Sequence, residues 1–247
     1  MKSSNTNQSS LIKQELINSE TTDFACIDMD ATCLSFVAAL DYAARMLDGE
    51  SYKNIAIVSS EVASKGLNPD NWETLTLFGD AAAAMIIQFD ESAESGIIHY
   101  NMKTYTEGTF HTIIKGGGNV YSFKENPYSP VLHSFQMQGK QLLKLAKRKI
   151  PIFMTDFFEE LEVKIEEIDF IIPHQASKLG VYLFEKLFQF TEGQVLKNLS
   201  EKGNCIAASI PSVFIENYQK GIINKGNTVL LCGTAAGFSI GAVLIKV

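Results

Sequence analysis

The chain is poor in the residues that build cross-links and metal sites. Only four cysteines and four histidines occur among 247 residues, no Cys-x-x-Cys pair is present, and no histidine spacing matches a metal site. Sparse, scattered cysteines are typical of a reducing compartment, so we expect a cytoplasmic protein without a metal. No apolar stretch reaches 18 residues, which argues against a transmembrane helix. The net charge of −7 does not favour nonspecific binding to nucleic acid or to anionic membranes.

What is present is a series of apolar segments with alternating helical and strand character. The β-branched run 54–60 is typical of a strand that is covered on both faces. The stretch 90–130 is polar and glycine-rich, so we expect it to form excursions of the chain, as loops, over the surface. Alternating helices and buried strands predict an α/β fold. Strands are expected at 23–29, 54–60, 81–89, 168–174, 227–234 and 238–247, and helices at 32–47, 138–162 (with a break at Pro151), 177–188 and 204–221.

A faint repeat relates the two halves of the chain. Cys33 precedes Gly49 by 16 residues, and Cys205 precedes Gly221 by 16 residues. Each glycine is followed by an apolar strand and then by an Ala/Gly-rich run that leads into another strand. This order indicates a duplicated α/β unit. It also puts Cys33 and Asn204 at near-equivalent places, each at the start of a buried helix.

The stretch DATCLSF puts Cys33 at the start of such a helix. A cysteine in a small, apolar run is often a packed core residue. At a helix N-terminus, however, the free N–H groups and the helix dipole stabilise a thiolate and lower the pKa of the thiol. The residues alone leave both interpretations open, a buried cysteine and a nucleophile.

Two further polar residues lie where strands or loops give way to helices. His174 follows the strand IDFIIP, and the end of a buried strand is where α/β folds place functional side chains. It is either a satisfied, half-buried histidine or an acid–base and oxyanion group. Asn204 is either a helix N-cap, a role that asparagine often fills, or a functional amide.

Five blocks of the sequence stand out in this order: DFACIDMDATCLSFVAALDYAARML, LFGDAAAAMII, IDFIIPHQAS, GNCIAASIPSVF and LLCGTAAGFSIGAVLI. Together they resemble the 3-oxoacyl-(acyl-carrier-protein) synthase III family and its close relatives, in the family's order and spacing. The resemblance covers the chain from about Leu11 onward. The family is longer before its cysteine, so we expect the first half of this chain to lack the family's N-terminal part.

The resemblance implies a thiolase-type fold, in which two similar α/β halves form αβαβα layers. The halves are expected at residues 1–130 and 131–247. The resemblance also implies a catalytic triad of Cys33, His174 and Asn204, with the backbone N–H groups of Cys33 and Ala236 as an oxyanion hole. The implied reaction transfers an acyl group from a thioester to Cys33 and condenses it with a decarboxylating malonyl thioester. It needs no cofactor beyond coenzyme A or carrier-protein thioesters, and the family implies a homodimer.

Several positions depart from the family's pattern. Trp72 replaces an arginine, and Ser177 and Leu179 replace an asparagine and an arginine of the block that contains His174. In GTAAGF, Thr234 replaces an aromatic residue and Ala236 a glycine. A retained triad with altered recognition residues favours secondary metabolism over the first step of fatty-acid synthesis. The alternatives are an inactive subunit of a heteromeric synthase and an acyl transferase that does not condense.

Basic residues on one predicted helix indicate a partner. Carrier proteins are acidic, so an acidic enzyme needs a local basic patch to attract one. The alternative is an ordinary solvated helix face. The candidate docking residues are Lys140, Lys144, Lys147 and Arg148, together with Lys178.

Overall fold

The fold was obtained as a computed structural model, which describes residues 7–16, 18, 20–92, 94–161 and 163–247. Four of the excluded segments (1–6, 17, 19 and 93) fall in the expected first half, and residue 162 ends an expected helix. The helices are α1 (Gln8–Gln14), η1 (Thr32–Leu34), α2 (Ser35–Met46), η2 (Ala63–Gly66), α3 (Trp72–Leu75), η3 (Thr106–Gly108), α4 (Pro130–His133), α5 (Gly139–Glu159), η4 (Ile165–Glu167), α6 (Lys178–Phe188), α7 (Leu199–Lys202), η5 (Ile206–Ala208) and α8 (Ser209–Gln219). The strands are β1 (Asn54–Val62), β2 (Asp80–Gln88), β3 (Gly96–Thr104), β4 (Thr112–Ile113), β5 (Gln136–Met137), β6 (Phe170–Pro173), β7 (Thr228–Ala235) and β8 (Ser239–Lys246).

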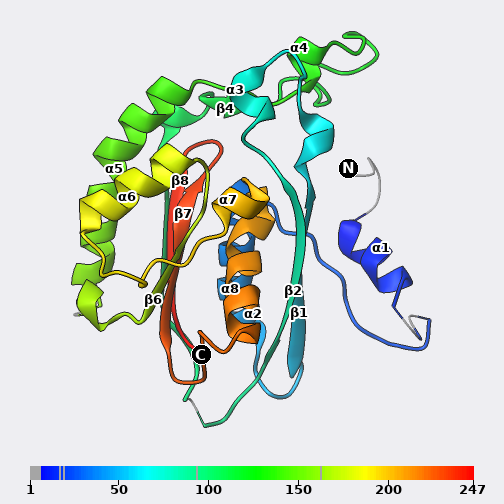
Figure 1. The fold of residues 1–247 in the computed structure, drawn as a ribbon. Helices are drawn as coiled ribbons and strands as arrows, with labels where there is room; N and C mark the ends of the chain where they lie inside the picture. Colours follow the sequence, from blue (N-terminus) through cyan, green and yellow to red (C-terminus); the bar gives the residue numbers. More distant parts are fainter. Residues whose placement is uncertain (1–6, 17, 19, 93, 162) are drawn as a thin grey trace.

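The elements stack in layers (Figure 1). Helices α5 and α6 cover one face of a four-stranded sheet, and α2 and α8 cover the other. The same two helices separate this sheet from the pair β1–β2, and α1 lies beyond that pair. The helix–sheet–helix–sheet order is the layered α/β arrangement expected from the sequence, with two sheets around a shared helical layer.

The larger sheet has the strand order β3-β8-β7-β6. Strand β6 is parallel to β7, whereas β7 and β8 are antiparallel and so are β8 and β3. Strand β3 was not predicted, because 90–130 was interpreted as surface excursions, and that interpretation is wrong for 96–104. Since β3 joins the sheet of the second half, the expected division at residue 130 does not describe which strands share a sheet.

The smaller sheet consists of β1 and β2, paired antiparallel from Asn54 with Gln88 to Val62 with Asp80. Exposed and covered residues alternate along both strands, so one face packs inward and the other faces out. The expectation that 54–60 is covered on both faces is therefore wrong. Only the inner face meets α2 and α8, and Ile86 on the outer face is 74% exposed.

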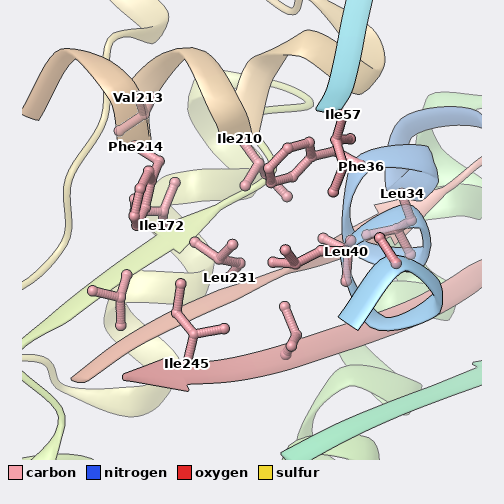
Figure 2. Close-up of a cluster of buried hydrophobic side chains, with 14 of the residues drawn as sticks. Leu34, Phe36, Leu40, Ile57, Ile172, Ile210, Val213, Phe214, Leu231 and Ile245 are labelled. Carbon is pink, nitrogen blue, oxygen red and sulfur yellow. The ribbon is translucent and has the colours of Figure 1, made fainter. Parts of the chain in front are cut away.

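Two apolar clusters hold the layers together. The first fills the space between the sheets and joins α2 and α8 to both of them, as Figure 2 shows for Phe36, Ile57, Ile210 and Leu231. The second packs α5 and α6 against the outer face of the larger sheet, with Phe157 at its centre. Each fully buried aliphatic or aromatic side chain contributes about 1.5–3 kcal/mol relative to exposure. The central cluster therefore fixes how η1 and η5, at the starts of α2 and α8, sit beside each other.

Two expected elements differ from the structure. Residues 23–29 form no strand, because their alternating pattern finds no sheet edge to pair with and most of their side chains are exposed. Helix α5 runs through Pro151 without a break. The carbonyl that Pro151 leaves unpaired belongs to Lys147, on an exposed turn where water can replace the lost hydrogen bond. Among the described helices, α5 included, none combines the length and the apolar character that a bilayer crossing requires.

Candidate active site

Cys33 lies in the short turn η1, which leads directly into α2. Thr32, just before it, has a φ of 51°, a left-handed conformation that is rare for a β-branched residue and typical of functional turns. The turn is fixed by side chains: the N–H of Thr32 donates to Asp30 Oδ1 (2.9 Å), and the N–H of Ala31 donates to Ser35 Oγ (2.9 Å). Cys33 is thus presented by a rigid, strained backbone at the start of a buried helix.

The same device recurs in the second half, at η5. There Ile206 has a φ of 49°, its N–H donates to Asn204 Oδ1 (2.9 Å), and the N–H of Cys205 donates to Ser209 Oγ (3.0 Å). Asp30 therefore corresponds to Asn204, and Cys33 corresponds to Ala207 rather than to Cys205. The duplication is real in the local structure, but the alignment expected from the glycine spacing is off by two residues.

The sulfur of Cys33 lies near two backbone N–H groups. The N–H of Ala236 and the N–H of Cys33 itself interact with it and lower the pKa of the thiol. Burial, together with the negative charge of Glu61, outweighs them and raises this pKa from 9.0 to about 12. The sequence predicted a lowered pKa, and that prediction is wrong for this structure. Cys33 is therefore a neutral thiol near pH 7, and a base must remove its proton before it attacks.

Ala236 reaches Cys33 without the backbone conformation that a glycine would supply. Its φ is not positive; the two residues after it, Gly237 (φ 77°) and Phe238 (φ 50°), make the left-handed turn between β7 and β8. Replacement of the family's glycine by alanine therefore leaves the N–H of residue 236 directed at the sulfur. The structure brings together the two residues predicted to form the oxyanion hole.

His174 directly follows β6 and is only 7% exposed. Its backbone N–H donates to the carbonyl of Cys232 on β7 (2.7 Å). Gly233 on β7 lies directly against its Cβ, so that any side chain there would collide with the histidine. Burial lowers the pKa of His174 from 6.5 to about 4, and its Nδ1 finds no hydrogen-bond partner among the described residues. The imidazole is neutral near pH 7 and offers one donor and one acceptor nitrogen.

Asn204 is buried at the end of the segment that precedes η5. Its Oδ1 is occupied by the N–H of Ile206, which fixes which end of the amide is which. The Nδ2 group is left as the donor, and its contact with the carbonyl of Ala176, at 3.5 Å, is at the outer limit of a hydrogen bond. The helix-cap role and the donor role, which the sequence offered as alternatives, are thus both available to the same side chain.

The segments that carry these three residues meet in one region. The turn η1 packs against both η5 and β7, and β7 is the strand that pairs with β6. Within the described part of the chain, no direct hydrogen bond joins the side chains of Cys33, His174 and Asn204. Neighbouring segments therefore carry a thiol, a neutral imidazole and an amide donor.

The predicted docking residues lie on exposed positions of two helices. Lys178 is the first residue of α6 and is exposed, as is Leu179 beside it (54%). Within the basic set on α5, Arg148 is paired with Glu107 (2.9 Å). The two helices lie side by side on the outer face of the larger sheet (Figure 1). The exposed residues of the set on α5 are Lys140, Lys144, Lys147 and Arg148.

Several residues that shape the site were not predicted from the sequence. Ser35 and Ser209 cap the two strained turns, and Asp30 occupies in the first half the place that Asn204 has in the second. A polar residue two positions before a left-handed residue, with serine three positions after it, is the pattern that both turns share. Glu61, on the inner face of β1, was missed because its effect on Cys33 depends on tertiary packing.

The fold and the cysteine turn at its centre define the thiolase-like class of proteins. The family model of 3-Oxoacyl-[acyl-carrier-protein (ACP)] synthase III matches residues 27–106, and the model of its C-terminal part matches residues 158–247. The chain belongs to this family, as the sequence motifs predicted.

Curated relatives and solved structures of the same family are similar to this chain over most of its length. The Beta-ketoacyl-[acyl-carrier-protein] synthase III of Clostridioides difficile is 31% identical over 219 residues, which cover 89% of this chain and 66% of the relative. The protein of the same name from Clostridium novyi is 30% identical, with 91% and 68% covered. The crystal structure of 3-oxoacyl-[acyl-carrier-protein] synthase III from Aquifex aeolicus has a TM-score of 0.82 at 25% identity, covering 97% of this chain and 71% of that one. The chain thus spans about two thirds of the length of these proteins.

Proposed function

We propose that the protein is a condensing acyltransferase that carries its acyl group on Cys33. The observation that carries the proposal is the presence of a half-buried cysteine, whose thiol interacts with the N–H of Ala236, in a segment next to an asparagine whose amide is oriented to donate. Family membership supports it, since the relatives are named as synthases of 3-oxoacyl carrier proteins.

In the first half-reaction, His174 accepts the proton of Cys33, and the thiolate attacks the carbonyl carbon of an acyl thioester. The oxyanion that forms is stabilised by the N–H groups of Cys33 and Ala236. The C–S bond of the donor then breaks, and its thiol leaves with the proton from His174. The raised pKa of Cys33 means that its proton must be taken up as the thiolate forms. The lowered pKa of His174 keeps the imidazole neutral and able to accept a proton but makes it a weak base, so we expect proton transfer and attack on the acyl carbonyl to occur together.

In the second half-reaction, a malonyl thioester loses carbon dioxide, and the electrons of the broken C–C bond form an enolate. His174 and the Nδ2 group of Asn204 donate hydrogen bonds to the enolate oxygen. The enolate carbon attacks the acyl carbonyl, a new C–C bond forms, and the Cys33 thiolate leaves and takes up a proton from water. The proposed reaction uses no metal or other cofactor beyond the thioester substrates.

We further propose an acyl carrier protein as partner, docking on the exposed lysines of α5 and Lys178, in a cytoplasmic homodimer. Charge complementarity supports the partner, because carrier proteins are acidic and these side chains are exposed. The changes at Leu179 and Thr234 support a donor or acceptor outside the first step of fatty-acid synthesis, with secondary metabolism as the setting.

The test is the intact mass of the protein after incubation with acyl-coenzyme A and acyl-carrier-protein donors. We expect an acyl adduct that is lost in Cys33→Ala and kept in Cys26→Ala, the matched control. Added malonyl thioester should discharge the adduct with release of carbon dioxide. No adduct on folded protein would contradict the enzyme and favour a scaffold subunit, and an adduct without carbon dioxide release would favour simple acyl transfer.

A further inference from the structure

Gln175, the residue after His174, is completely buried, yet both ends of its amide are satisfied. Its Oε1 accepts from the backbone N–H of Asn198 (2.9 Å), and its Nε2 donates to Asn198 Oδ1 (3.1 Å). Two hydrogen bonds to one residue define both distance and orientation. Breaking them would leave buried polar groups unpaired, at a cost of about 1–3 kcal/mol for each group. The backbone beside His174 is therefore fixed to Asn198.

Asn198 passes this constraint to the segment that carries Asn204. Its Nδ2 donates to Glu216 Oε2 on α8 (3.2 Å), and the other carboxylate oxygen of Glu216 is ion-paired with Lys202. Burial raises the pKa of Glu216, but its contacts with Lys202 and Asn198 together lower it by more, so the carboxylate is charged near pH 7. Lys202 is the last residue of α7, two positions before Asn204, and its N–H donates to the carbonyl of Asn198 (3.0 Å).

The contacts close into a ring. Asn204 Nδ2 faces the carbonyl of Ala176, the residue after Gln175, at 3.5 Å. The segment 174–176 and the segment 202–204 are thus joined at one end by this contact. At the other end they are joined through Gln175, Asn198, Glu216 and Lys202.

We propose that Gln175, Asn198 and Glu216 are positioning residues that hold His174 and Asn204 at the separation needed for decarboxylation. The inference rests on the proposed function. Two donors stabilise one enolate oxygen only when both lie about 2.7–3.1 Å from it, so a small displacement of either segment weakens the second half-reaction. Acyl transfer to Cys33 needs His174 only to accept a proton. Its oxyanion is stabilised by the N–H groups of Cys33 and Ala236, which lie outside the ring. Only decarboxylation needs His174 and Asn204 at a fixed separation, so displacement of the ring should slow the second half-reaction much more than the first.

The first test measures the two half-reactions separately in Gln175→Met. We expect the kcat of malonyl decarboxylation to fall at least tenfold while the KM for the malonyl thioester stays within twofold. The rate of Cys33 acylation should stay within threefold. Glu216→Gln keeps an acceptor for Asn198 and removes only the charge that faces Lys202, so we expect a two- to fivefold fall in decarboxylation.

The matched control is Gln194→Met. Gln194 is also a buried glutamine, 6% exposed, and its Nε2 donates to the carbonyls of Ile165 (3.0 Å) and Ile168 (2.7 Å) near the other end of β6. Its loss should change stability as Gln175→Met does and leave the ratio of the half-reactions unchanged. An equal slowing of both half-reactions in Gln175→Met, or the same ratio in both variants, would overturn the inference.

A second readout needs no turnover. In NMR spectra, the side-chain amide of Asn204 and the ring of His174 should shift in Gln175→Met and stay in place in Gln194→Met. Unchanged shifts in Gln175→Met would disprove the ring whether or not the protein is active. A wild-type protein that forms no Cys33 adduct would instead contradict the proposed function, and the NMR comparison alone would then decide the ring.

Discussion

The turns η1 and η5 are built on the same plan and carry different chemistry. Each has a side-chain acceptor, a left-handed β-branched residue and a serine cap in the same order, and each opens a helix of the central layer. In the first half the device presents Cys33 from inside the turn. In the second half it presents the capping residue itself, Asn204, and the position matching Cys33 is an alanine. The two halves thus share the same backbone turn but place the functional side chain at different positions in it.

The sheets behind the two turns differ more than the turns do. Every residue of β8 from Ser239 to Ile245 is buried, because the larger sheet has helices on both faces. Strand β2 is exposed at every second residue. The turns η1 and η5 therefore have the same backbone geometry although the strands of the two sheets differ greatly in burial. This indicates that the side-chain caps, rather than the sheets, define the turns.

The largest effect is expected when the matching acceptors are exchanged, in Asn204→Asp and Asp30→Asn. Asn204→Asp keeps the acceptor for Ile206 and removes the donor, so decarboxylation should fall by about 10²–10³-fold, as for other oxyanion donors. Asp30→Asn keeps the cap for Thr32, and decarboxylation should stay within about twofold of wild type, since a conservative surface change costs under about 0.5 kcal/mol. Carbon dioxide release from the malonyl thioester measures both. Similar losses in the two variants would contradict a special role for position 204.

A smaller effect, on stability, compares the two sheets. Leu231→Ala on β7 removes a fully buried side chain and should lower the free energy of unfolding by about 2–5 kcal/mol. Ile86→Ala on the outer face of β2 should change it by less than about 0.5 kcal/mol. Urea denaturation followed by circular dichroism gives both values. A cost above about 2 kcal/mol for Ile86→Ala would show that the outer face of β1–β2 is covered in solution.

The smallest effect is expected for the pH dependence of stability, which arises from His174 in the second half of the chain. His174 has a pKa of about 4 in the folded chain and 6.5 as its ordinary value, so the unfolded chain binds the proton more readily between these values. The stability that goes with the neutral, buried imidazole is present above pH 6.5 and is lost as pH falls toward 4. Urea unfolding at pH 7.5, 6 and 5 should show this decline, and His174→Gln should reduce its slope. An unchanged slope in the variant would assign the decline to other groups.

The strongest elements could be predicted from the sequence because their apolar patterns are local. Helices α2, α6 and α8 and strands β6, β7 and β8 follow from such patterns, and Cys33, His174 and Asn204 were placed where helices begin or a strand ends. The alignment of the two halves was wrong because it used the glycines after the helices, and loop lengths there differ between the halves. Strand β3 was missed because its pairing with β8 is a tertiary contact.

The electrostatics of the site could not be predicted, because burial is a property of the assembled layers. A helix N-terminus lowers the pKa of a thiol, but the tight packing around Cys33 raises it by more. The ring through Gln175 was missed for a similar reason, since Gln175 and Asn198 are 23 residues apart and only the fold brings them together. Residue types at the ends of helices and strands indicate the chemistry, whereas their protonation states depend on burial in the folded protein.

The serine cap of η5 has a further consequence, for the chemical ageing of the protein. Spontaneous deamidation of an asparagine begins when the backbone nitrogen of the next residue attacks the side-chain carbonyl carbon and closes a succinimide ring. At Asn204 that nitrogen belongs to Cys205, and its N–H is held by Ser209 Oγ while the side-chain oxygen is held by Ile206. The two hydrogen bonds keep the reacting atoms in place and oppose ring closure. Ser209 thus protects, over the lifetime of the molecule, the one amide whose conversion to a carboxylate would leave the turn folded and the donor lost.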